Sequence, residues 1–197
     1  QPDHMANAPQ HDIALDDLRT KLKDAVPGEL QFVGTFDGSL LEGDGALHIF
    51  QFTAAVGGNP AESYFVVVGD TEPNYYPAYD LTGDDMYSVH LGTRFMLVVG
   101  VGQLPTNELP DTLEQDVVAD LARIAPAEPI THFEIAAAFH VENQKHAVCK
   151  LNIASERVYI ITGDLPLGIC RRIDLPPHVV YRLHLGSVIR SEASDTD

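Results

Sequence analysis

The sequence contains no tryptophan, only two cysteines and no long apolar run. A helix that spans a bilayer needs about 18 consecutive apolar residues, whereas the longest apolar stretch here, FMLVVGVG at 95–102, suits a buried strand. The N-terminal residues also lack the basic and apolar regions of a secretory signal. We therefore expect a soluble, cytoplasmic protein with no membrane partner.

The two cysteines, Cys149 and Cys170, are too few for a disulfide framework, and their spacing matches no zinc pattern. Small buried thiols in a reducing compartment are the simpler interpretation. The chain also has no phosphate-binding P-loop, no dinucleotide-binding glycine motif, no nucleophile elbow and no HExxH zinc motif. These absences lead us to expect neither a metal nor a cofactor.

Basic residues are scarce, since 12 lysines and arginines stand against 29 aspartates and glutamates, and the formal net charge is −17. Such a charge repels the phosphates of nucleic acids, so we expect no nucleic-acid partner. Three explanations of the acidity compete: solubility in a salty environment, attraction of a basic protein partner, and imitation of nucleic acid. Because the acidic residues are scattered rather than grouped in blocks, the sequence favours the first.

One phrase appears twice, as YSVHLGTRF at 87–95 and as YRLHLGSVI at 181–189. The longer segments 62–95 and 156–189 align without a gap at a constant offset of 94 residues. Nine aligned positions are identical: Glu62/Glu156, Gly69/Gly163, Asp70/Asp164, Asp80/Asp174, Leu81/Leu175, Tyr87/Tyr181, His90/His184, Leu91/Leu185 and Gly92/Gly186. Clustered matches of this kind predict an internal duplication, and two copies favour a pseudo-twofold pair over a solenoid.

Each half has the pattern of several strands followed by a helix. In the second half, apolar and polar residues alternate over 132–142, which predicts a strand with one buried face. The expected buried side chains are Phe133, Ile135, Phe139 and Val141, and the expected exposed ones are Glu134, His140 and Glu142. The segment 157–164 is apolar on both faces, as in a central strand.

The repeated phrase itself predicts a short helix of roughly two to three turns. Thr82 and Asp85 have the spacing of a capping box at the start of the first copy. Gly92 and Gly186 stand where a helix often ends in a left-handed glycine, and the apolar residues 94–102 are expected to form another strand.

We therefore predict an α+β protein of two homologous halves, each a small antiparallel sheet with a short helix. A single half of roughly 65 residues buries too little surface to be stable alone, so the halves are expected to pack as a pseudo-twofold duplicate. The expected segments are a cloning remnant (1–4), a disordered N-terminus (5–11), a first unit with a leading helix (12–105), a linking amphipathic helix (106–128), a second unit (129–190) and a disordered tail (191–197).

The repeated acidic and imidazole residues are the first candidate site. Carboxylate and imidazole groups together bind metals or transfer protons. An enzyme or ligand-binding site between the halves would use Asp80, His90, Asp174 and His184. Turn formation and helix capping explain the same residues without chemistry, so we favour a structural role for both histidines.

A second candidate is the strand face that carries His132, Glu134, His140 and Glu142. Its two His–Glu pairs lie about 26 Å apart along a strand, too far to share one metal. A solvated sheet face is therefore the simpler interpretation.

A third candidate is the tyrosine-rich segment around Tyr75, Tyr76 and Tyr79, which has no counterpart in the second half. Exposed tyrosines favour binding because they offer a large contact area at low entropic cost. With the acidity and the missing catalytic motifs, this segment favours a non-enzymatic accessory protein, adaptor or chaperone-like, that binds a protein partner. The alternatives are an enzyme, metal or small-ligand binder that uses His90 and His184, and a nucleic-acid mimic that binds a basic protein.

Overall fold

The computed structural model describes residues 30–41, 45–55, 60–69, 73–124 and 127–195. In this part of the chain, two antiparallel sheets, of four and five strands, combine with three α-helices, so the predicted α+β class is confirmed. Residue contacts divide the chain into two compact units between His90 and Leu91. The predicted leading helix, the segments 1–4 and 5–11, and Asp70 lie outside the described residues.

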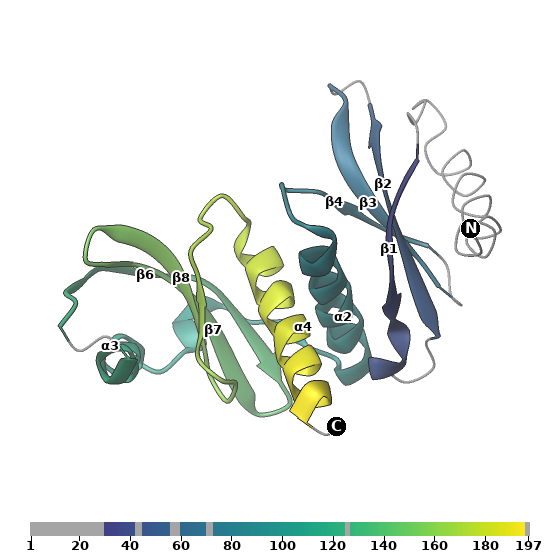
Figure 1. The fold of residues 1–197 in the computed structure, drawn as a ribbon. Coiled ribbons are helices and arrows are strands. Elements are labelled where there is room, and N and C mark those ends of the chain that lie inside the picture. Colours follow the sequence, from purple (N-terminus) through teal and green to yellow (C-terminus); the bar gives the residue numbers. More distant parts are fainter. Residues whose placement is uncertain (1–29, 42–44, 56–59, 70–72, 125–126, 196–197) are drawn as a thin grey trace. The chain divides into compact units, whose positions relative to one another are not determined.

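The first unit contains a sheet with the strand order β1-β2-β3-β4 (Figure 1). Its elements are β1 (Gln31–Asp37), the 3-10 helix η1 (Gly38–Leu40), β2 (Ala46–Ala54), β3 (Glu62–Val68) and β4 (Asn74–Pro77). The helix α2 (Gly83–Val99) follows β4. It begins at the predicted capping box, because the Asp85 N–H donates to Thr82 Oγ1 at 3.1 Å and the Thr82 N–H donates to Asp85 Oδ2 at 3.3 Å.

The second unit contains a sheet with the order β5-β6-β7-β8-β9. Its strands are β5 (Gly102–Gln103), β6 (Ile130–Val141), β7 (Gln144–Ile153), β8 (Glu156–Thr162) and β9 (Gly168–Cys170). Its other elements are the 3-10 helix η2 (Thr106–Glu108), α3 (Leu113–Ile124) and α4 (Pro177–Asp195). The strand β8 is an inner strand of this sheet and is buried from Val158 to Ile161, as the apolar pattern predicted.

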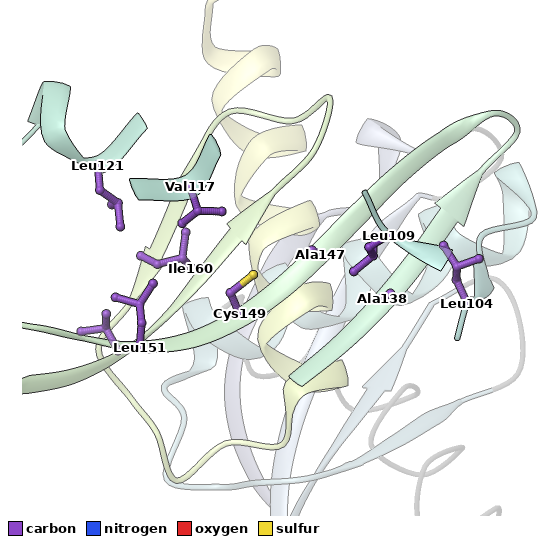
Figure 2. Close-up of a cluster of buried hydrophobic side chains, with 10 residues drawn as sticks. Leu104, Leu109, Val117, Leu121, Ala138, Ala147, Cys149, Leu151 and Ile160 are labelled. Carbon is purple, nitrogen blue, oxygen red and sulfur yellow. The ribbon is translucent and has the colours of Figure 1, made fainter. Parts of the chain in front are cut away.

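Helices cover both faces of this second sheet, with α3 on one side and α4 on the other (Figure 1). On the α3 side, Val117 and Leu121 pack with Cys149 and Ile160 of the sheet (Figure 2). On the α4 side, the ring of Tyr181 stacks on Phe139, with 4.0 Å between ring centroids. The predicted linking helix is therefore part of the core of the second unit.

The aligned elements begin 94 residues apart in the two halves. The strands β3 and β8 begin at Glu62 and Glu156, the strands β4 and β9 at Asn74 and Gly168, and the helices α2 and α4 at Gly83 and Pro177. The predicted equivalence of secondary structure in segments 62–95 and 156–189 is thus confirmed. The origin of the halves by duplication stays a prediction, as does their pseudo-twofold arrangement.

We predicted that the repeated phrase ends a short helix, and this prediction is wrong. The helices α2 and α4 continue to Val99 and Asp195, so Gly92 and Gly186 lie in helix interiors. The residues 94–99, expected in a strand, continue α2, and Gly100, at φ +72°, is the left-handed residue that follows it. The expected disordered tail at 191–197 is also wrong in part, because α4 extends to Asp195.

The predicted alternation along β6 fails because the pairing of β6 with β7 shifts register between Ile135 and Ala137. A bulge of this kind moves the following side chains to the opposite face. Phe133 and Ile135 accordingly pack on the α3 side, whereas Phe139 packs on α4. Of the expected buried residues, only Phe139 is buried, whereas Phe133, Ile135 and Val141 are half-buried. His140, which was expected to be exposed, is also half-buried.

Candidate functional site

In the first unit, the repeated phrase places a buried histidine against a tyrosine. His90 of α2 is only 2% exposed, and its Nδ1 lies 2.8 Å from the hydroxyl of Tyr76 on β4. Tyr87, one turn earlier in α2, stacks on Phe36 and donates a hydrogen bond to the carbonyl oxygen of Asp37. Both residues of the phrase therefore hold α2 against the sheet of the first unit.

In the second unit, the equivalent tyrosine has a different partner. The hydroxyl of Tyr181 lies 2.7 Å from Nδ1 of His146 on β7, and the two side chains are 0% and 2% exposed. Sequence reasoning missed His146 as a site residue. The signal was a histidine directly before the apolar residues 147–149 of β7, but its partner lies 35 residues further along the chain.

Burial controls the protonation of this pair. Burial raises the pKa of Tyr181, so the phenol stays protonated. Burial also lowers the pKa of His146, which favours the neutral imidazole. Nε2 of His146 is buried and has no hydrogen-bond partner among the described residues. An unsatisfied buried polar atom costs about 1–3 kcal/mol, so the pair is a marginally tolerated polar site in the core.

Two residues of the repeated set lie near His146. The carboxylate of Asp164 raises the pKa of His146 and the charge of His184 lowers it, although burial has the larger effect. His184 donates from Nε2 to the carbonyl oxygen of Pro166 at 3.0 Å, and burial lowers its pKa. His184 also lines a cavity of about 360 Å³ with Cys170 and Arg171. The structure thus brings Asp164, Tyr181 and His184 into one region.

The predicted carboxylate partners of the histidines have other roles. Asp80 is exposed and has a positive φ of 58° in the turn before α2. Asp174 forms an ion pair with Arg172 at 3.2 Å, and the hydrogen bond from Arg172 lowers its pKa. No group of three histidine, cysteine or acidic residues in the described part of the chain could hold a metal ion.

His132 and Glu134, on the second candidate strand face, make contacts that hold the sheet together. Glu134 forms an ion pair with Arg157 at 2.8 Å, and the same guanidinium donates to the carbonyl oxygen of His132. His132 and Glu142 both have positive φ angles, of 57° and 55°. Glu134 and Glu142 are exposed, as predicted.

The tyrosine-rich segment is an edge strand rather than an exposed loop. Tyr75 and Tyr76 are neighbours on β4 and point to opposite faces of the sheet, since Tyr75 packs near Phe52 and Tyr76 contacts His90. Tyr76 is buried, Tyr75 is half-buried, and Tyr79 has a positive φ of 47°. The role of these tyrosines in binding stays a prediction.

An apolar groove lies between α3 and the start of β6. We call it the α3–β6 groove, and its apolar walls are Val118, Ala119, Ala122, Ile130 and Phe133. It has a volume of about 450 Å³, and Glu114 and His132 stand beside the apolar walls. Val118 is 37% exposed, and Ile124 at the end of α3 is 59% exposed.

The prediction of a buried thiol is confirmed for Cys149, and burial raises the pKa of this thiol to about 12, whereas Cys170 is only half-buried. No helix in the described residues has both the length and the apolar character needed to cross a membrane. No family model, curated protein or solved structure matches this chain.

Proposed function

We propose that this protein is a non-enzymatic accessory protein, adaptor or chaperone-like, that binds a partner polypeptide in the α3–β6 groove. The observation that carries the proposal is the open apolar surface of the groove. Apolar side chains such as Val118 and Phe133 line it, although the adjacent face of α3 already supplies Val117 and Leu121 to the core. A helix whose apolar surface extends beyond the residues that it buries in the core favours a second packing partner.

Charge defines the partner chemistry that suits this groove. Glu114 lines the groove, Asp116 and Asp120 lie on the same helix, and the whole chain carries a formal charge of −17. A segment that combines apolar side chains with lysine or arginine would match both the apolar walls of the groove and the negative charge around it. The proposed partner is therefore a basic, apolar polypeptide segment. We place the protein in the cytoplasm, which its two unpaired cysteines favour.

The test uses two labelled synthetic peptides of equal length, one of alternating leucine and lysine and one of alternating leucine and glutamate. We expect the basic peptide to bind in fluorescence anisotropy and the acidic one not to bind. Val118→Asn should weaken binding about tenfold because it removes apolar contact without adding charge. Ile173→Asn is the matched control, since Ile173 is 44% exposed and lies outside the groove.

The proposal would be refuted if the basic and acidic peptides bound equally well. It would also be refuted if Val118→Asn and Ile173→Asn weakened binding of the basic peptide to the same extent. A change of oligomeric state in Val118→Asn, measured by sedimentation, with no peptide binding by the original protein, would identify the groove as a contact between copies of this chain and would also refute it.

A further inference from the structure

A second cavity in the second unit lies on the α4 side of the sheet and contains an arginine that pairs with no carboxylate of the described residues. The cavity has a volume of about 480 Å³ and lies between the start of α4, the strands β5 and β6, and Met96. Its polar side chains are Gln103, His178 and Arg182, and its apolar ones include Met96 and Phe139.

Arg182 differs from the other arginines of this unit. Four of them pair with carboxylates: Arg123, Arg157, Arg171 and Arg172. Among the described residues, Arg182 has no carboxylate partner, and its Nε is buried without a hydrogen-bond acceptor. Arginine stays charged at all physiological pH values, and a buried donor without an acceptor destabilises the fold. In a chain with 29 acidic residues, this arginine is left available for an anion from outside.

The surroundings of Arg182 add to this preference for an anion. Burial lowers the pKa of His178, and the positive charge of Arg182 lowers it further, so the imidazole beside the arginine is a neutral hydrogen-bonding group. The cavity lies at the N-terminal end of α4, which begins at Pro177 and carries the positive end of the helix dipole.

We propose that this cavity binds a small organic acid, with its carboxylate on Arg182 and its apolar body against Met96 and Phe139. The planar guanidinium matches a carboxylate better than any other side chain does. The volume lies within the range of about 300–1,000 Å³ found for small-molecule sites. The apolar walls select an acid with a hydrocarbon part over a bare inorganic anion. The site is separate from the α3–β6 groove, which lies on the other face of the sheet.

The experiment is calorimetric titration of the full chain with three probes: octanoate, octanamide and inorganic phosphate. We expect octanoate to bind, and octanamide and phosphate to bind at least about tenfold more weakly. Arg182→Gln should weaken octanoate binding by at least about tenfold, because it removes the charge and keeps a polar side chain of similar length. Arg123→Gln, which removes an exposed arginine on α3, should leave the affinity unchanged.

A second variant keeps the test decisive if Arg182→Gln does not fold. Ala136→Leu extends a side chain into the same cavity without changing charge, and it should also abolish octanoate binding. Ala122→Leu makes the same change in the α3–β6 groove and should not affect octanoate. Absence of octanoate binding, octanoate binding that Ala136→Leu leaves intact, or phosphate binding as tight as that of octanoate would overturn the proposal.

Discussion

Gly92 of α2 lies directly against the backbone of Arg182 in α4. A Cβ added to Gly92 would come within 2.0 Å of the carbonyl oxygen of Arg182, closer than real Cβ atoms approach any other atom. The glycine in the repeated phrase therefore does not end the helix. It permits close backbone packing at the point where the side chain of Arg182 lines the cavity described above.

Gly92→Ala is expected to destabilise the protein although alanine favours helix formation. Alanine contributes up to about 1 kcal/mol over glycine inside a helix, whereas forced overpacking against a backbone costs about 1–3 kcal/mol. We expect the free energy of unfolding, measured by urea denaturation, to fall by about 1–2 kcal/mol. Ser187→Ala, at an exposed position of α4, is the control and should change it little. A Gly92→Ala variant as stable as the original protein would contradict the close contact.

Gly163→Ala should cost more stability than Gly100→Ala. Both glycines have positive φ angles, of 143° and 72°, so alanine is strained at each position. At Gly163 a Cβ would also come within 2.7 Å of the carbonyl oxygen of Lys145, whereas at Gly100 no atom of the described residues lies within 4 Å of it. We expect a loss of about 1 kcal/mol at Gly100 and of several kcal/mol at Gly163, measured by thermal and urea unfolding. Equal losses would show that the segment after β8 relaxes around the added methyl group.

His146 should make the protein less stable in acid. Its pKa in the folded state is lowered from 6.5 by burial, so the unfolded chain binds a proton more readily than the folded one does. The stability that neutral His146 confers is fully present above about pH 6.5 and is lost as the pH falls below that value. We expect the free energy of unfolding to decrease between about pH 7 and about pH 5, and to decrease less in His146→Gln.

The control for this pH dependence is His140→Gln, which removes a half-buried histidine of β6 away from the Tyr181 pair. It should keep the acid sensitivity of the original protein. Part of the sensitivity should remain in His146→Gln as well, because burial also lowers the pKa of His48, His178 and His184. Identical pH profiles for His146→Gln and the original protein would refute the assignment.

The sequence by itself determined the local structure of this protein. Alternating apolar residues predict strands because successive side chains of a strand point to opposite faces, and the spacing of Thr82 and Asp85 predicts the start of α2 because the capping bonds join neighbouring residues. The constant offset of 94 residues also identified the equivalent strands and helices of the two halves. All of these signals act over a few residues or compare one segment with another.

Only the tertiary structure decided the helix ends, the faces of β6 and the partners of the buried histidines. Gly92 resembles a terminating residue in sequence, but helix packing holds it in the interior of α2, since the contact with Arg182 requires the absence of a side chain. The register shift after Ile135 depends on how β7 pairs with β6. His146 meets Tyr181 because the sheet and α4 bring together residues 35 positions apart, and no local pattern encodes such a contact.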